Sequence, residues 1–338
     1  MIFQNIEFHN VSYLEKSEQG GYITHRLPAN VEEVMAPGGK AASRSITGVE
    51  LRFKMISDTV KLVFVGNENS TALFNVYRGG VIGSWPEVGV MIAGEGEREI
   101  VIKKYADMPS LQKVSEAAGY EFSPEVIRIV PDHDSFRFVR VEGEVAPPEK
   151  EDLPSKTYYA YGSSITHGSS SITTPLNFVS LVGEHFRADV RNLGIAGNAR
   201  LEPEVIREIA DAGKRGEWDF ASLCMGINIL SIDTSEFEER VKYAVYTVAE
   251  ANPGKHIFCI SPFYCNEDMR GSEKPSEFRK VVERVVNDYA SPYVHYVCGA
   301  DILDGPWGLS GDLVHPSPLG VRAIADGLIK EFSKYITR

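Results

Sequence analysis

Strand-like and helix-like segments alternate through the second half of this chain, and the alternation limits the folds that it can adopt. Short apolar runs occur at Thr157–Gly162, Asp189–Leu193, Phe220–Met225, His256–Ser261 and Tyr293–Val297. Segments of helical periodicity follow them at Pro175–Arg187, Pro203–Ala212, Glu236–Ala251, Ser276–Tyr289 and Ser317–Ile336. Strands joined by helices form a parallel sheet through right-handed crossovers, with helices on both faces. The pattern predicts a three-layer α/β domain with a flavodoxin-like parallel sheet.

The first 145 residues have a different pattern, with short runs rich in β-branched residues and separated by turn signals. Alternation in Val49–Met55 places an apolar residue at every second position, as expected for a strand with one wet face. The expected strands are Gly48–Met55, Thr59–Val65, Ala72–Arg78, Glu99–Lys103, Val126–Val130 and Phe136–Glu144. One helix is expected within Leu111–Ala118. Several short strands with little helix indicate an all-β sandwich of the jelly-roll type.

A stretch rich in proline and charge separates these two patterns. It contains Ala146-Pro147-Pro148 and four charged residues that follow directly. Proline fixes φ and charge disfavours collapse, so this stretch is expected to be a linker. The chain of 338 residues is thus predicted to have a β-sandwich domain at 1–145, a linker at 146–156 and an α/β domain at 157–338.

Charge and composition exclude several classes of partner. The formal net charge is −12, and the absence of a basic stripe argues against nucleic-acid binding. Apolar runs fall short of the roughly 20 residues that a membrane-spanning helix needs. The N-terminus lacks the basic and apolar regions of a signal peptide, and the four cysteines form no Cys-x-x-Cys pair. We therefore expect a cytoplasmic protein that acts on a small molecule or saccharide, without nucleic-acid or membrane partners.

Polar residues follow the predicted strands where a parallel sheet places its active site, at the strands' carboxyl ends. Ser164 follows the first strand, and a serine becomes nucleophilic when a neighbouring base takes its proton. Asp312 precedes His315 by three residues, so its carboxylate can hold one ring nitrogen while the other faces a serine. The alternatives are a plain serine-rich loop for Ser164 and a helix cap for Asp312.

Two glycine–asparagine turns could stabilise an oxyanion. Gly197 allows close approach of the backbone, and the Asn228 side chain offers a neutral donor. Taken singly, an ordinary strand-end turn at Gly197 and an Asx-turn at Asn228 are the simpler interpretations. Their combination with a serine and an Asp–His pair, in this order, favours acyl transfer through a serine.

The ordered set Gly162-Ser163-Ser164, Gly197, Gly226-Ile227-Asn228 and Asp312-Leu313-Val314-His315 resembles the four blocks of the SGNH hydrolase superfamily, also called GDSL esterases or lipases. The resemblance covers Thr157–Arg338. It implies that Ser164 is the nucleophile, His315 the general base and Asp312 the residue that orients it. It also implies an oxyanion hole formed by the Ser164 N–H, the Gly197 N–H and the Asn228 side chain. The preceding β domain is similar to the N-terminal sandwich of some carbohydrate esterases and acyltransferases.

Two positions depart from the pattern of the superfamily. Ser163 stands where the first block usually has Asp, which makes Ser163 a rival nucleophile, and Ile229 stands where the third block usually has Asp. Neither position is one of the four that give the superfamily its name. The departures bear on substrate preference and on the placement of the first turn.

Three further residues are candidates for substrate binding. His167 lies three residues beyond Ser164, Arg200 follows the Gly197 turn, and Trp307 precedes the Asp–His turn on a Gly/Pro loop. The alternatives are a surface loop position for His167, a salt bridge to Glu202 or Glu204 for Arg200, and plain packing for Trp307. The remaining histidines are scattered without metal-ligand spacing, so neither a metal nor a cofactor is expected. They are His9, His25, His133, His185, His256 and His295.

Together these features predict a serine esterase that acts through an acyl-enzyme. Polar residues near Ser164, such as Ser169, Ser170 and Thr173, favour a short acyl group, acetyl above all, on a carbohydrate or other polar alcohol. The alternatives are acyl transfer to an acceptor alcohol by the same residues, and a carbohydrate-binding protein without activity.

Overall fold

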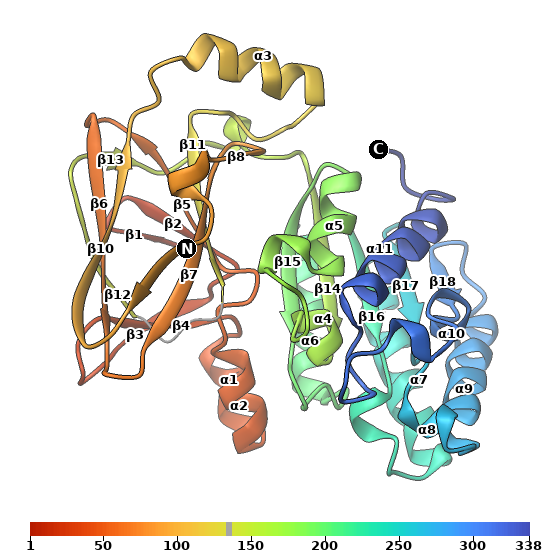
Figure 1. Ribbon diagram of the computed structural model, residues 1–338. Helices are drawn as coiled ribbons and strands as arrows, with labels where there is room; N and C mark the ends of the chain where they lie inside the picture. Colours follow the sequence, from red (N-terminus) through yellow and green to blue (C-terminus); the bar gives the residue numbers. More distant parts are fainter. Residues whose placement is uncertain (133–136) are drawn as a thin grey trace. The chain divides into compact units, whose positions relative to one another are not determined.

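The computed structural model describes residues 1–132 and 137–338, which form two compact units. The first unit comprises Met1–Ala29 and Arg44–Ser155, and the second comprises Asn30–Ser43 and Lys156–Arg338 (Figure 1). Asn30–Ser43, predicted to lie in the N-terminal domain, groups with the α/β unit, and residues 146–155, predicted to be a linker, group with the first unit. No helix in the described ranges has the length and apolar character needed to cross a membrane.

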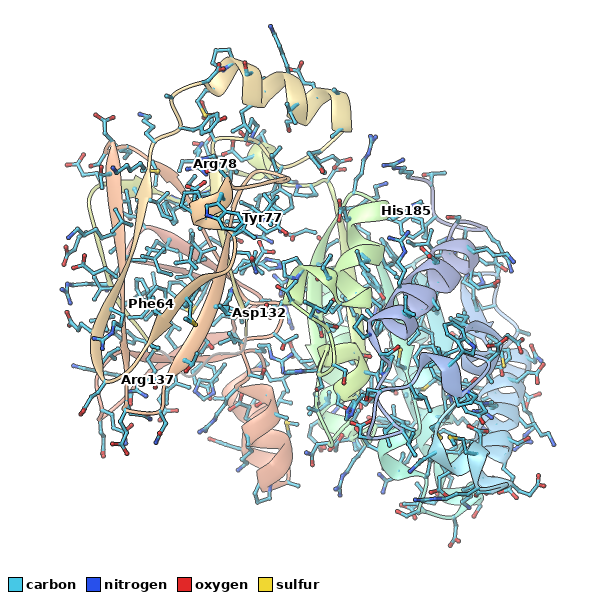
Figure 2. The ribbon with its side chains drawn as sticks, in the orientation of Figure 1. Phe64, Tyr77, Arg78, Asp132, Arg137 and His185 are labelled. Carbon is cyan, nitrogen blue, oxygen red and sulfur yellow. The ribbon has the colours of Figure 1, made fainter. Side chains whose placement is uncertain are left out.

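The first unit contains two antiparallel sheets. One sheet has the order β1 (Ile2–Phe3), β2 (Ile6–His9), β5 (Glu50–Met55), β11 (Val126–Asp132), β7 (Thr71–Arg78) and β8 (Val81–Ile82), with β13 (Val145–Ala146) on β5 and β9 (Val90–Ala93) on β7. The other has the order β10 (Gly96–Lys103), β6 (Thr59–Gly66), β12 (Arg137–Glu142), β4 (Tyr22–His25) and β3 (Tyr13–Lys16). Alternate side chains of both sheets form one apolar core. Phe64 points into this core (Figure 2).

The predicted antiparallel β structure of the N-terminal part is confirmed. The expected helix is present as α3 (Met108–Ala118), with Asp107 as its N-cap. The short strands β1 to β4 and the helices α1 (Ala29–Val34) and α2 (Pro37–Ser43) were not predicted from the sequence. Phe136, expected to begin a strand, lies outside the described residues.

A buried ion cluster joins β5 to β11. Glu50 accepts hydrogen bonds from Arg52 at 2.8 Å and from Arg128 at 2.6 and 2.8 Å. Burial raises the pKa of Glu50, but the positive charges of Arg128 and Arg52 outweigh it and lower the pKa to about 2. Arg128 also lies over the Phe122 ring, 3.9 Å from its centroid. The strands are therefore joined by a charged cluster in addition to their ladder.

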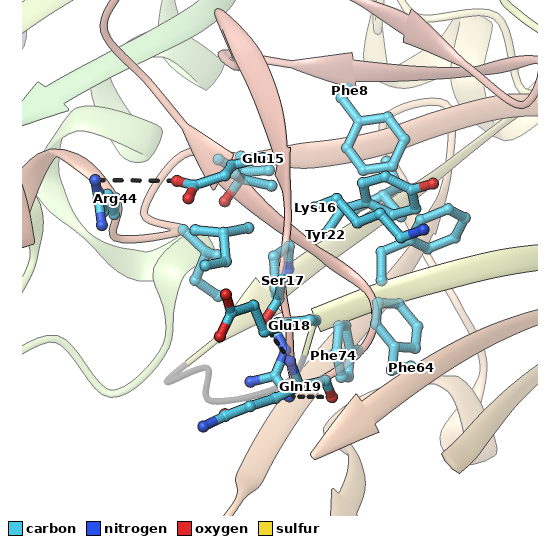
Figure 3. A pocket seen from close by; sticks show the side chains of 18 residues that line it. Phe8, Glu15, Lys16, Ser17, Glu18, Gln19, Tyr22, Arg44, Phe64 and Phe74 are labelled. Carbon is cyan, nitrogen blue, oxygen red and sulfur yellow. Dashed lines mark hydrogen bonds and ion pairs between the residues drawn. The ribbon is translucent and has the colours of Figure 1, made fainter. Parts of the chain in front are cut away.

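A cavity of about 570 Å³ opens in the first unit. Aromatic side chains of both sheets, including Phe8, Phe64 and Phe74, line it together with charged residues of the β3–β4 hairpin (Figure 3). Arg44 approaches Glu15 at 4.0 Å beside it. The cavity is thus apolar on one side and charged on the other.

The second unit is built on one parallel sheet. Its strand order is β15 (Ala188–Gly194), β14 (Lys156–Gly162), β16 (Phe220–Cys224), β17 (His256–Ile260) and β18 (Val294–Val297). Helices α5 (Phe178–His185) and α11 (Pro318–Phe332) pack together on one face, while α6 (Pro203–Lys214), α7 (Thr234–Ala251) and α9 (Lys274–Tyr289) follow one another on the other (Figure 1). The rings of Phe258 and Phe332 stack with their centroids 3.7 Å apart. The predicted three-layer parallel α/β fold is confirmed.

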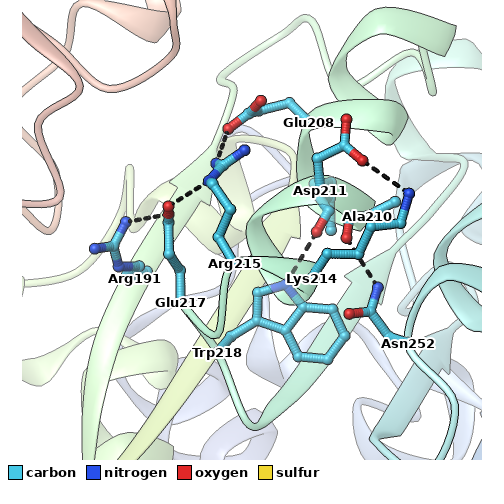
Figure 4. A network of polar contacts seen from close by, with 10 residues as sticks. Arg191, Glu208, Ala210, Asp211, Lys214, Arg215, Glu217, Trp218 and Asn252 are labelled. Atoms are coloured by element: carbon cyan, nitrogen blue, oxygen red, sulfur yellow. Dashed lines mark hydrogen bonds and ion pairs between the residues drawn. The ribbon is translucent and has the colours of Figure 1, made fainter.

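Ion pairs and amide contacts fix the end of α6 and the loop that leads to β16. Arg215 pairs with both Glu208 and Glu217, and the Trp218 indole donates to the Ile209 carbonyl at 3.0 Å (Figure 4). The Asn252 amide donates to the Ala210 carbonyl at 3.0 Å and so connects α7 to α6. This network lies at the amino ends of the strands, which leaves the carboxyl ends free for chemistry.

Candidate active site

Ser164 begins a short helix directly after β14. In this helix, α4 (Ser164–His167), Ser163 is the N-cap and its Oγ accepts a hydrogen bond from the Ile165 N–H at 3.2 Å. Gly162 is required before it, because a Cβ there would lie 2.1 Å from Thr166 Oγ1. The rival nucleophile Ser163 is thus occupied as a cap, with 2% of its surface exposed.

Three side chains form a continuous hydrogen-bonded chain at the carboxyl edge of the sheet. His315 Nε2 lies 2.7 Å from Ser164 Oγ, although 151 residues separate the two in sequence. His315 Nδ1 lies 2.5 Å from Asp312 Oδ2. The structure therefore brings together the three residues proposed for catalysis. In this arrangement Nε2 can take the serine proton while the Nδ1–H group stays hydrogen-bonded to the Asp312 carboxylate.

The Asp312 carboxylate is held ionised by its own turn. Its Oδ1 accepts from the N–H groups of Val314 and His315, both at 2.9 Å, and from Ser310 Oγ at 3.0 Å. Partial burial raises the pKa of Asp312, but these hydrogen bonds and the one to the His315 ring lower it well below the usual range. The helix-cap alternative does not apply, because Ser317 caps α11. Asp312 is therefore free to orient the imidazole.

The two glycine–asparagine turns meet beside Ser164. Gly197 has φ of 69°, a left-handed conformation, and a Cβ on it would have no atom within 4 Å. The Asn228 Oδ1 accepts a hydrogen bond from the Ala199 N–H at 3.1 Å. This contact joins two separate turns and is not an Asx-turn, which would bind a backbone N–H close by in sequence. With Oδ1 occupied in this way, the NH₂ group of Asn228 remains as a donor.

Each of the three candidates for substrate binding makes a polar contact with a residue other than Ser164 or His315. The Arg200 N–H donates to Glu202 at 3.2 Å, its carbonyl accepts from Arg240, and its side chain is exposed. Trp307 is 55% exposed, and its indole donates to Asp304 at 2.8 Å. His167 ends α4, and its ring lies 3.5 Å from Ser169 Oγ. Their roles in binding remain predictions.

Two residues near the site were missed by the sequence analysis. Asn192 donates to the Thr166 carbonyl and accepts from the Gly194 N–H, both at 2.8 Å, and so ties α4 to β15. Gly38 of α2 lies against Asn198, since a Cβ there would lie 3.0 Å from both amide atoms. The buried asparagine at a strand end was a usable signal for the first. Nothing in the sequence indicates the second contact.

A parallel sheet with a Ser–His–Asp chain at its carboxyl edge has the geometry of a serine hydrolase. Residues 160–323 match the model of the GDSL-like lipase/acylhydrolase family. That range includes Ser164, Gly197, Asn228, Asp312 and His315. This part of the chain, 164 of 338 residues, is similar to that family, and the similarity supports a serine ester hydrolase of the SGNH class.

Solved structures share the fold over nearly the whole chain. A salicylyl-acyltransferase, SsfX3 from a tetracycline biosynthetic pathway, is 17% identical with a TM-score of 0.77 and covers 98% of this chain and 94% of its own. A family two carbohydrate esterase from Cellvibrio japonicus is 12% identical, with a TM-score of 0.62 and coverage of 98% and 95%. The corresponding Clostridium thermocellum esterase, in complex with cellohexaose, is 15% identical, with a TM-score of 0.52 and coverage of 97% and 98%. Among curated proteins, none matches the sequence significantly.

Proposed function

We propose that this protein hydrolyses short-chain acyl esters of a carbohydrate or another polar alcohol, with Ser164 as the nucleophile. The observation that carries the proposal is the unbroken contact from Asp312 through His315 to Ser164 Oγ. The similarity of residues 160–323 to the GDSL-like lipase/acylhydrolase family also supports it. The proposal extends beyond the family in naming the substrate class and the role of each residue.

The geometry supports a two-step reaction. Ser164 Oγ attacks the ester carbonyl as its proton passes to His315 Nε2, and the resulting oxyanion accepts hydrogen bonds from the Ser164 N–H, Gly197 N–H and Asn228 NH₂. Collapse of the tetrahedral intermediate breaks the ester C–O bond, and the alcohol leaves with the proton from His315. Water then attacks the acyl-enzyme with His315 as base, which releases the acid and restores the serine.

The substrate class is supported by the polar character of the loop that follows Ser164. Residues 169–171 are all serine, and Asn198 directly follows Gly197 in the turn after β15. The carbohydrate esterases from Cellvibrio japonicus and Clostridium thermocellum among the similar structures are consistent with a saccharide ester. We expect p-nitrophenyl acetate to be hydrolysed with a higher kcat/KM than p-nitrophenyl decanoate. Faster turnover of the decanoate would refute a short-acyl preference.

Acyl transfer to an acceptor alcohol is a second candidate, favoured by the similarity to an acyltransferase with a TM-score of 0.77. Both reactions share the acyl-enzyme and differ in whether water or an alcohol attacks it. Product analysis of p-nitrophenyl acetate turnover, with and without cellobiose or glycerol, distinguishes them. Acetylated acceptor formed in excess over acetate would identify a transferase. The intact hydrogen-bonded chain argues against the third alternative, a binding protein without activity.

The experiment that tests the nucleophile is covalent labelling by a fluorophosphonate probe, which reacts with an activated serine and releases fluoride. We expect the wild-type protein and Ser163→Ala to be labelled, and Ser164→Ala to remain unlabelled. Peptide mapping of the wild-type adduct should identify Ser164. Labelling lost in Ser163→Ala but kept in Ser164→Ala would reverse the assignment, and a wild-type protein that does not react would favour the binding protein.

A further inference from the structure

We infer that Arg279 is a positioning residue for the proposed catalytic site, because it fixes a loop that contacts two turns of that site. One turn carries Asp312 and His315 and is called the base turn; the other carries Asn228 and is called the oxyanion turn. The loop consists of Pro262–Asp268 and follows β17; we call it the clamp loop. The inference rests on the proposed roles of His315 and Asn228. Arg279 lies on α9 and does not itself touch the catalytic atoms.

Arg279 is almost fully engaged by the clamp loop. Its two terminal nitrogens contact the two Asp268 carboxylate oxygens at 2.7 and 2.8 Å. Its Nε donates to the Pro262 carbonyl at 2.9 Å, and Nη2 donates to the Phe263 carbonyl at 3.1 Å. The side chains of Arg279 and Asp268 are only 12% and 14% exposed. One planar guanidinium thus binds both ends of the loop at once.

Asp268 completes the loop from its other side. Its Oδ2 also accepts from the Cys265 N–H at 3.0 Å, which closes the turn that starts α8 (Asn266–Met269). Partial burial raises the pKa of Asp268, but hydrogen bonds from Arg279 and the Cys265 N–H lower it below its usual value. The carboxylate therefore stays charged, and the fork-to-fork pair persists at neutral pH.

The clamp loop reaches the base turn through one backbone hydrogen bond. The Asn266 N–H donates to the Leu313 carbonyl at 2.9 Å. Leu313 lies between Asp312 and His315 and has a left-handed φ of 61°, a conformation that residues other than glycine rarely adopt. Its side chain is 41% exposed, so packing does little to hold it. The turn has internal hydrogen bonds, from the Leu313 N–H to the Ser310 carbonyl at 3.0 Å and from the Ser310 N–H to the His315 carbonyl at 2.7 Å, and the bond from Asn266 ties this turn to the clamp loop.

The same loop contacts the turn that carries Asn228. Gly226 opens that turn with φ of 110°, and a Cβ on it would lie 3.0 Å from the Pro262 ring. The preceding Met225 N–H donates at 3.0 Å to the carbonyl of Ile260, two residues before the clamp loop begins. A shift of Pro262 would therefore displace the oxyanion donor as well as the base. Misplacement by about 1 Å in such a site can cost about 10²-fold in rate.

A purely structural ion pair is the competing explanation, and Arg279→Lys separates the two. Lysine keeps the charge but cannot hold the carboxylate and two carbonyls together. We expect kcat for p-nitrophenyl acetate and the fluorophosphonate labelling rate to fall about 10- to 10²-fold, with KM changed less than about twofold. Labelling should still reach the wild-type stoichiometry, because the protein is folded and only its site is misplaced. Arg284→Lys is the matched control on the same helix, where Arg284 pairs with Glu238 at the surface.

A variant of the loop itself keeps the inference testable if Arg279→Lys does not fold. Asn266 is the first residue of α8, where proline is tolerated, and Cys265 before it is extended. Asn266→Pro removes the N–H that binds Leu313, whereas Asn266→Ala retains it, so the proline variant should lose far more of the labelling rate. Wild-type kcat in folded Arg279→Lys, or equal rates in the two Asn266 variants, would overturn the inference. Lower labelling stoichiometry at an unchanged rate would also overturn it, since that indicates unfolding. A wild-type protein without labelling at Ser164 would instead refute the proposed function.

Discussion

Ala199 and Asn228 join the turns that follow the two strands on either side of β14, because the Ala199 N–H donates to Asn228 Oδ1 at 3.1 Å. Ser164 follows β14 itself, so the two turns flank the proposed nucleophile. The hydrogen bond fixes the orientation of the Asn228 amide. Its NH₂ group is thereby set as a donor rather than free to exchange places with the oxygen.

Asn228→Ala is expected to lower kcat by about 10²–10³-fold, because one preorganised oxyanion donor is lost. Asn228→Asp keeps an acceptor for Ala199 but replaces the donor with a negative charge, so its loss should be larger. Steady-state hydrolysis of p-nitrophenyl acetate measures both. A variant with normal kcat and raised KM would show that Asn228 binds the ground state and is not an oxyanion donor.

Asp312→Asn should lower kcat by up to about 10⁴-fold, since an amide can donate to His315 Nδ1 and favour the wrong tautomer. The control is Ser310→Ala, which removes only one donor to Asp312 Oδ1 and leaves the contact with the imidazole. Its effect on kcat should be small. If Asp312→Asn retained full activity, His315 would act as a base without help from this carboxylate.

The elements that position the proposed catalytic residues could be predicted because their signals are local. Apolar runs and helical periods located the strands of the second unit, and the parallel topology then brought Gly162, Gly194 and Cys224 to one edge of the sheet. The Asp312–His315 pair needed only a short turn. Ser164, Asp312 and His315 were predicted from these signals and lie within hydrogen-bonding distance of one another, while their catalytic roles stay predictions.

The contacts that support the site could not be predicted, because they depend on tertiary packing. Arg279 and Asp268 are charged residues of the kind expected on a solvent-exposed surface. Only the fold shows that their side chains are largely buried. Likewise, α2 contains Pro37, Gly38 and Gly39, which weaken any helical signal, and its place beside Asn198 is set by long-range contacts. The two-residue strand β1 carries too little periodicity to be recognised.

The second unit should lose stability as pH falls below about 6.5, because of a histidine pair between β17 and β18. His256 Nδ1 and His295 Nε2 lie 2.8 Å apart. Burial, reinforced by His256, lowers the pKa of His295 to about 4. The unfolded chain therefore binds a proton between pH 6.5 and 4 that the folded unit does not, and stability falls across that window. Urea unfolding, monitored through the loss of Ser164 labelling, should show a lower midpoint at pH 5 than at pH 7.5. In His295→Phe the difference between the two midpoints should be smaller.

Glu50 gives the first unit a different acid dependence. Its pKa of about 2 lies below the usual carboxyl value because Arg128 and Arg52 outweigh its burial. The stabilisation is therefore complete above about pH 4.5, and it is lost as pH falls toward 2, where the folded carboxylate also takes a proton. Hydrogen exchange of β5 and β11 peptides in the intact protein should show accelerated opening over that range.

Glu50→Gln tests this mechanism at neutral pH. Glutamine removes the negative charge that faces two buried guanidinium groups, which should cost about 3–5 kcal/mol. The matched control is Glu97→Gln, whose partner Arg140 lies at the surface, so its effect should be small. Protection of β5 and β11 should fall in Glu50→Gln and remain near wild type in Glu97→Gln. Equal protection in the two variants would show that the buried cluster does not stabilise the sheet beyond its backbone ladder.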